Sequence, residues 1–96
     1  MARKPDPIRF ADPPGTFIRE ELKAREWAQG YLAIKMGRPL QTLNLIINGH
    51  KAITAETAIE LGTAFGTSAV YWMNLQSAYE LYIAAQKKRK AVTVQK

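Results

Sequence analysis

The stretch from Trp27 to Lys51, W-A-Q-G-Y-L-A-I-K-M-G-R-P-L-Q-T-L-N-L-I-I-N-G-H-K, has the pattern of two short helices joined by a tight turn. Apolar residues at helical spacing predict one helix over about 28–36 and a second from about Pro39 to Asn48. Gly37 lies between them, where a permissive residue lets the second helix leave at a steep angle. Proline suits the first turn of a helix, because its missing N–H has no partner there. The stretch therefore predicts a helix-turn-helix unit.

The second of these helices separates into two faces when its residues are placed at intervals of about 100°. The face expected to be buried is apolar and consists of Leu43, Ile46 and Ile47, with Leu40 at its edge. The opposite face is polar apart from one leucine and consists of Gln41, Thr42, Asn44 and Leu45. Amides can bond bidentately to adenine, and an exposed apolar group can contact a thymine methyl. This layout is typical of a DNA-reading helix. A solvated polar face without a ligand is the alternative.

Three residues around this unit suit contact with phosphates. Arg38 lies in the turn and Lys51 lies just past the second helix, so both are placed for the two sides of a groove. Gln29, at the start of the first helix, can add a bond beside the free N–H groups of that helix end.

Working outward, the chain reads as an all-α domain of five helices with a long C-terminal helix. We expect an irregular arm over 1–12, the helix-turn-helix domain over 13–87, and a basic flexible tail over 88–96. Apolar stripes predict further helices from Pro14 or Thr16 to Arg25, from Thr54 to Phe65, and from Thr67 or Ser68 to about Lys87. Only 91–94, in the tail, resembles a strand.

The last helix carries too many apolar residues for a single buried face. Trp72, Leu75 and Tyr79 recur at i, i+3 and i+7, so we expect them to pack on the core. A second set, Met73, Tyr82 and Ile83, is then left for a second subunit or another protein. Core packing of the whole set is the alternative.

The charges are unevenly distributed along the chain. Lys and Arg number 14 against 8 Asp and Glu, for a net charge of +6. All charged residues over 27–55 are basic, all over 52–86 are acidic, and the tail is basic again from Lys87 to Lys90. Two faces for two partners would explain this pattern, the basic face suiting a polyanion, and so would solubility charge on a solvated surface. The basic tail either contacts DNA or is a solvated end.

The composition excludes several other classes of protein. The 96 residues fit one domain, and without cysteine there are no disulfides or thiolate metal sites. The only histidine, His50, has no carboxylate near it in sequence, so we expect a surface residue and neither a metal nor a cofactor. No nucleophile–base arrangement indicates an enzyme. No apolar run could span a membrane or serve as a secretory signal, so we expect a cytoplasmic protein.

Three segments of the chain resemble the HigA family of antitoxins, within the phage-repressor-like helix-turn-helix group. They are P-P-G-T-F-I-R-E-E-L (13–22), M-G-R-P-L-Q-T-L-N-L-I-I-N-G-H-K-A-I-T-A-E-T-A (36–58) and G-T-S-A-V-Y-W-M-N-L-Q-S-A-Y (66–79). The resemblance implies a five-helix domain that dimerises and binds a palindromic operator in its own promoter. It also implies a HigB-like toxin partner, a small basic ribonuclease that cuts messenger RNA and that the antitoxin binds and silences.

The resemblance also bears on individual residues. Seven match the DNA-contacting places of the family, and Asn44 joins them from the helix geometry: Gln29, Arg38, Leu40, Gln41, Thr42, Asn44, Leu45 and Lys51. Ala28 and Pro39 stand where members often carry a capping serine, so phosphate contacts there are expected to be weaker. Two other functions remain open. They are a dimeric repressor without a toxin, and an interaction module that does not bind DNA.

Overall fold

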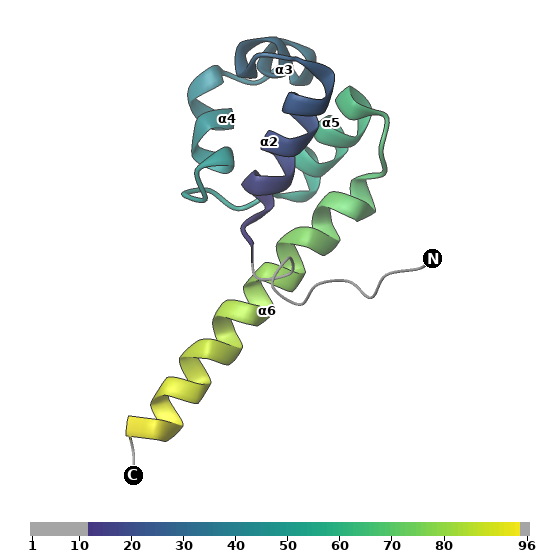
Figure 1. Ribbon diagram of the computed structural model, residues 1–96. Coiled ribbons are helices and arrows are strands. Elements are labelled where there is room, and N and C mark those ends of the chain that lie inside the picture. The colour runs from purple at the N-terminus through teal and green to yellow at the C-terminus, as the bar shows by residue number, and fades with distance from the viewer. Residues whose placement is uncertain (1–11, 95–96) are drawn as a thin grey trace.

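The computed structural model describes the backbone of residues 12–94 and the side chains of residues 12–90. This part of the chain forms five helices and no strand: α2 Pro14–Arg25, α3 Gln29–Met36, α4 Leu40–Ile47, α5 Ala55–Phe65 and α6 Ala69–Val94 (Figure 1). The predicted all-α architecture of five helices is therefore confirmed. Of the arm expected over 1–12, all but Asp12 lies outside the described residues.

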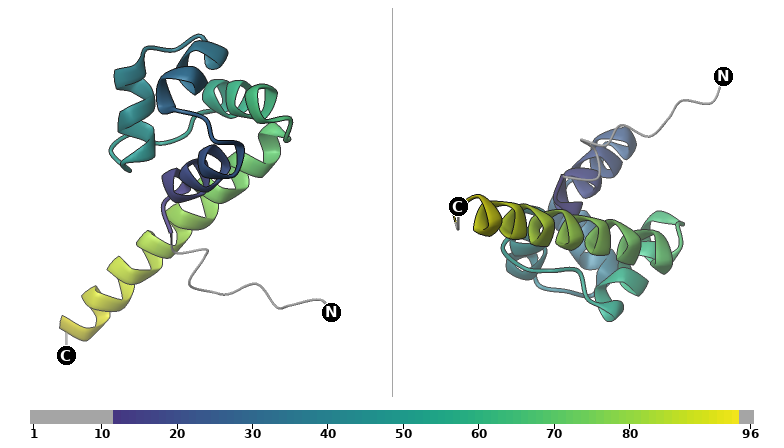
Figure 2. Two further views of the ribbon diagram at one scale, coloured as in Figure 1. Left: turned by 45° about the horizontal axis from the view of Figure 1, so that its top comes forward. Right: turned by 90° about the horizontal axis from the view of Figure 1, so that it is seen from below.

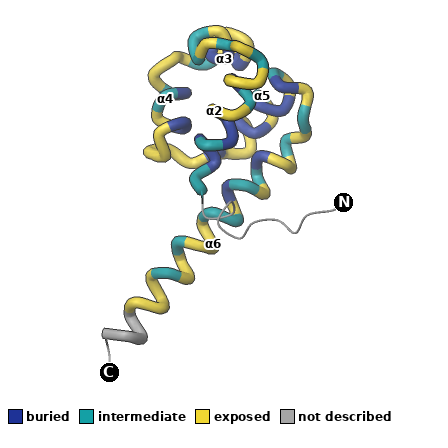
Figure 3. The backbone as a smooth tube through the Cα atoms, viewed as in Figure 1, coloured by how far each residue is buried: buried dark blue, intermediate teal, exposed yellow. Residues whose placement is uncertain are grey.

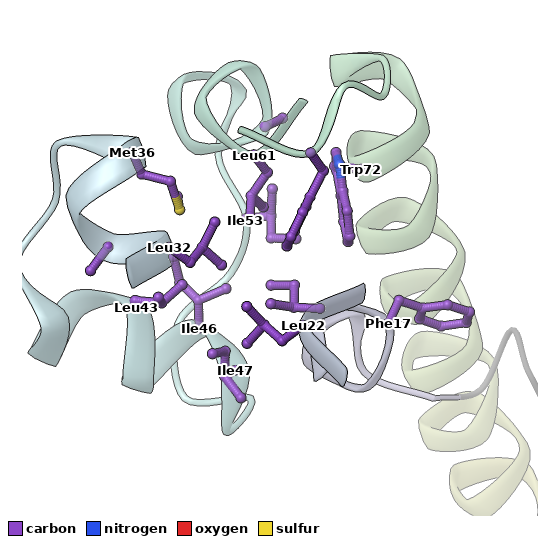
Figure 4. Close-up of a cluster of buried hydrophobic side chains, with 14 residues drawn as sticks. Phe17, Leu22, Leu32, Met36, Leu43, Ile46, Ile47, Ile53, Leu61 and Trp72 are labelled. Carbon is purple, nitrogen blue, oxygen red and sulfur yellow. The ribbon is translucent and has the colours of Figure 1, made fainter. Parts of the chain in front are cut away.

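One hydrophobic core joins α2, α3, α4 and α5 to the first turns of α6 (Figure 4). Its largest fully buried side chains are Trp72, Ile18, Leu32, Leu43, Ile46, Ile47 and Leu61. The apolar stripes of α2 and α5 are confirmed, since Leu22, Ala58 and Phe65 are buried as well. Of the stripe expected in α6, Trp72 lies in the core and Leu75 packs against it, whereas Tyr79 is half-buried outside it. A buried Leu or Ile stabilises the fold by about 1.5 to 3 kcal/mol, so this cluster holds the helix-turn-helix unit in place.

Gly37 ends α3 in the left-handed region, with a φ of 70°. Its N–H donates to the carbonyl of Ile34 at 3.1 Å, and the next N–H, that of Arg38, donates to the carbonyl of Ala33 at 3.0 Å. Glycine adopts this conformation without the strain that a side chain adds. The predicted tight turn between the two helices is therefore present.

Gly15 brings the backbones of α2 and α4 into direct contact. A Cβ atom at this position would lie only 1.9 Å from the carbonyl oxygen of Ile47. No side chain other than hydrogen fits there without moving one of the two helices. The first turn of α2 therefore sets where the last turn of α4 lies.

Side-chain hydrogen bonds fix the segment between α4 and α6. Thr54, where this helix was predicted to start, is the N-cap of α5, and its hydroxyl accepts the N–H of Thr57. Gln76 of α6 is 8% exposed, and its Oε1 accepts the N–H of Ile53 at 2.9 Å. Its Nε2 donates to Glu80 at 2.8 Å. Gln76 thereby connects the loop after α4 to α6, a role that its place in an apolar run does not reveal.

The helix α6 begins inside the core and then leaves the domain (Figures 1 and 3). Trp72 is fully buried, and its indole N–H donates to the Thr67 hydroxyl at 2.8 Å. The helix continues past the expected end at Lys87 to Val94, so 88–94 is helical and not a strand. The physical reason is that no glycine or proline interrupts the chain after Gly66, while alanine, lysine and arginine favour helix. Among the described residues, no helix is long and apolar enough to cross a membrane.

Candidate nucleic-acid interface

The helix α4 has a buried back and an exposed front. Leu43, Ile46 and Ile47 are at most 2% exposed. The opposite face leaves Gln41 and Leu45 exposed, with Thr42 and Asn44 half-buried beside them. The predicted separation of the two faces is confirmed, whereas the contact of these residues with DNA stays a prediction.

Two leucine side chains of α4 are exposed to water, which is unfavourable for apolar groups. Leu40 is 45% exposed and Leu45 is 46% exposed. Leu40 thus lies on the outer side of the helix, more exposed than its place at the edge of the buried arc predicts. On a helix of eight residues these two side chains add apolar surface beside the polar groups of Gln41 and Asn44. Thymine methyl groups in a major groove offer such a surface a partner.

The C-terminal end of α4 is anchored by a polar contact as well as by Gly15. The guanidinium of Arg19 donates to the Asn48 side-chain oxygen at 2.5 Å. The N–H of Asn48 in turn donates to the carbonyl of Asn44 at 2.9 Å. Helix α4 is therefore held at its back by the core and at its end by α2. Such support keeps a recognition helix at a fixed angle to its target.

Arg38, in the turn before α4, already has a carboxylate partner. Its Nε and Nη2 donate to the two carboxylate oxygens of Glu60 at 2.7 and 2.9 Å, and Glu56 lies 4.0 Å away. The hydrogen bonds and charge of Glu60 raise the pKa of Arg38. Glu60 lies 22 residues after Arg38 in the sequence, so this pair was not predicted from the sequence. A phosphate that binds Arg38 must accept from the remaining N–H groups of the guanidinium or displace Glu60.

The start of α3 offers backbone donors. Ala28 is the N-cap residue and makes no side-chain cap bond, as its missing hydroxyl predicts. The first N–H groups of a helix have no partner within the helix and attract anions. Gln29 is half-buried at this end, and a Cβ atom on the adjacent Gly30 would meet nothing within 4 Å. The contact of this helix end with a phosphate stays a prediction.

Lys51 and His50 are exposed in the loop after α4, as expected. The loop lies beside α6, because His50 and Lys51 line a pocket of about 150 Å³ together with Gln76 and Tyr79 of that helix. Among the described residues, no group of three or more His, Cys, Asp or Glu side chains could hold a metal ion.

The residues expected at a second interface separate into two groups. Met73 is half-buried and packs on the chain's own core, because it lies one residue after Trp72 near the start of α6, where the helix still contacts the domain. Its place at an interface stays a prediction, now for the part of its side chain that the core leaves uncovered. Tyr82 is 40% exposed and Ile83 is half-buried, on the part of α6 that leaves the domain. Leu81 is 72% exposed beside them and was not singled out from the sequence.

Comparison with known proteins agrees with this geometry. A family model described as helix-turn-helix matches residues 18–72. The virulence-associated protein I of Dichelobacter nodosus is 38% identical over 77 residues, which are 79% of this chain and 71% of that protein. An uncharacterised HTH-type transcriptional regulator of Escherichia coli K12 is 34% identical over 68 residues, which are 71% of this chain and 72% of that regulator.

Two solved structures are also similar. The Pseudomonas aeruginosa antitoxin HigA, solved with the higBA promoter, is 36% identical with a TM-score of 0.79 and covers 85% of this chain and 90% of its own. An addiction module antidote protein of a HigA family from Coxiella burnetii is 33% identical, again with a TM-score of 0.79, and covers 90% of this chain and 95% of its own.

Proposed function

We propose that this chain, which belongs to the helix-turn-helix family, is an antitoxin. It represses its own operon and neutralises a toxin. In this role it binds operator DNA and a HigB-like, mRNA-cleaving toxin. Its structural neighbours are HigA-family antitoxins, one of them solved with its promoter, which supports both parts of the proposal.

The exposed front of α4 is the observation on which DNA binding rests. Gln41 and Leu45 lie on a face that the fold turns to solvent, while Leu43 anchors the back at 0% exposure. The amide of Gln41 would bond to a base edge, and Leu45 would contact a thymine methyl. Gln29, Arg38 and Lys51 would bind the flanking phosphates and set the register.

A homodimer completes the proposed assembly. Two copies related by a two-fold axis would place their α4 helices in successive major grooves, about 34 Å apart. Leu81, Tyr82 and Ile83 on α6 supply apolar surface that this chain leaves partly uncovered. This surface would bind the second subunit or the toxin. Apolar surface exposed in this way has no role in a monomeric domain.

A dimeric repressor without a toxin is the second candidate. The similarity to an HTH-type transcriptional regulator favours it. Both candidates act on DNA in the cytoplasm, and they differ only in the protein partner.

Co-expression with the protein encoded beside this gene separates the two candidates. If that neighbour arrests growth, and this chain restores growth and co-purifies with it, the antitoxin function stands. If the neighbour is harmless or does not bind this chain, the chain is a repressor alone.

A further inference from the structure

The end of α6 carries four consecutive basic residues on a formed helix. Lys87, Lys88, Arg89 and Lys90 are all exposed. No acidic residue follows Glu80 in the sequence, so this stretch carries a net positive charge. Because α6 continues to Val94, these residues lie on a formed helix.

Their arrangement around the helix fits a polyanion better than a protein surface. Successive residues of a helix are about 100° apart, so four in a row point in nearly all directions around the axis. No apolar stripe is left at this level for packing against a second copy. Parallel copies would bring like charges together, which costs free energy. A nucleic-acid backbone presents negative charge over a wide arc and suits such an end.

The contacts of the loop after α4 place this basic end relative to the candidate DNA interface. Lys51 shares a pocket with Gln76 and Tyr79, and the N–H of Ile53 bonds to Gln76. Lys51 therefore lies beside α6 at about the level of Tyr79. At a rise of about 1.5 Å per residue, residues 87–90 follow that level by about 12 to 17 Å. In Figure 1 and in the left view of Figure 2, both α4 and the end of α6 lie toward the left of the molecule, α4 at its upper end and the end of α6 at its lower end.

We propose that the basic end of α6, residues 87–90, is a second contact to the DNA backbone that is independent of base sequence. The distance of about 12 to 17 Å corresponds to about four to five base pairs at a spacing of about 3.4 Å. With α6 running along the duplex, the basic end would reach backbone about that far from the phosphate proposed for Lys51. This inference rests on the proposed binding of α4 to DNA, and it adds affinity without adding base preference.

The test compares three full-length proteins on two DNA fragments of equal length. The proteins are the wild type, a variant with all four residues replaced by glutamine, and a charge-preserving control, Lys87→Arg with Lys88→Arg and Lys90→Arg. Glutamine and arginine both favour helix, and circular dichroism checks that α6 remains formed. One fragment carries the promoter of the gene and the other a random sequence. Fluorescence anisotropy gives the affinity between about 50 and 200 mM salt.

We expect the glutamine variant to bind both fragments about tenfold to a hundredfold more weakly at low salt. The slope of log K against log salt should fall by about 2 to 4, because each lost phosphate contact removes about 0.9. The arginine control should behave as the wild type. Hydroxyl-radical footprinting should show protection about four to five base pairs from the position lost in Lys51→Gln, and this protection should be absent in the glutamine variant.

Wild-type affinity and slope in the glutamine variant would show a solvated helix end and overturn the inference. A loss confined to the promoter fragment would overturn it too, since the contact would then depend on sequence. If the wild type shows no preference for the promoter, the operator function fails instead. A weaker binding of the glutamine variant to random DNA would still support the basic end in that case.

Discussion

Helix α4 and the outer part of α6 differ in what surrounds them. The core, Gly15 and Arg19 hold α4 at its back and at its end. The part of α6 from Leu81 to Lys90 projects from the domain and is mostly exposed (Figure 3). A short helix that is held so firmly can present side chains at a fixed angle. A long helix that leaves its own domain exposes apolar residues, which the proposed second subunit or toxin would cover.

The largest effect is expected from a comparison of Leu43 in α4 with Leu81 in the outer part of α6. Leu43 is 0% exposed and Leu81 is 72% exposed. Leu43→Ala should lower the free energy of unfolding by about 2 to 5 kcal/mol because it leaves a cavity in the core. Leu81→Ala should change it by less than about 0.5 kcal/mol in a dilute, monomeric sample. Chemical denaturation measures both, and similar losses would show that α6 is packed within the chain.

Gly15→Ala tests how firmly α4 is held. The new Cβ would overlap the carbonyl of Ile47, so α2 and α4 must separate. We expect a loss of about 3 kcal/mol in unfolding free energy. Gly30→Ala is the matched control, since its Cβ meets nothing within 4 Å. This change should raise the free energy of unfolding by about 0.5 to 1 kcal/mol. A neutral Gly15→Ala would contradict the close crossing of the two helices.

The partner of the outer α6 can be sought with the double change Leu81→Ser and Tyr82→Ser. If this surface holds the second subunit, the dissociation constant of the dimer should rise by a factor of about 30, or about 2 kcal/mol. Analytical ultracentrifugation at several concentrations gives that constant, and Ser77→Ala, an exposed change nearer the domain, serves as the control. An unchanged dimer, with loss of toxin binding instead, would assign the surface to the toxin.

Smaller effects are expected at Glu60, which restrains Arg38. Glu60→Gln removes a carboxylate and frees a guanidinium that faces the candidate interface. Operator and random DNA should both bind about threefold to tenfold more tightly, and the salt slope should steepen by about 0.9 for one added phosphate contact. Weaker binding in the variant would mean that Glu60 orients Arg38 for the phosphate instead of competing with it.

The sequence alone predicted the regions that depend on local patterns. Apolar spacing and the turn at Gly37 defined α3 and α4, and Thr54 marked the start of α5, because periodicity and capping act over a few residues. The contacts that were missed join distant positions, as Arg38 with Glu60 and Ile53 with Gln76 do. Only the packing of the helices brings such pairs together.

The end of α6 was missed for a different reason. Helices commonly end at glycine or proline, and neither follows Gly66, so no local signal gave the position of the last turn. A run of basic residues after the apolar stretch then resembled a solvated tail. The contact of Met73 with the core was missed because a residue's angle around a helix does not tell how far the helix stays in contact with its domain.

Base reading by α4 is the central claim, and Gln41→Ala tests it most directly. Gln41 is exposed, so its loss should leave the fold intact. The measurement is the ratio of affinities for the promoter fragment and for random DNA at one salt concentration. We expect promoter binding to weaken by about 1 to 3 kcal/mol while random DNA binds as before, so the ratio falls. Equal losses on both fragments, or none, would contradict base reading by this helix.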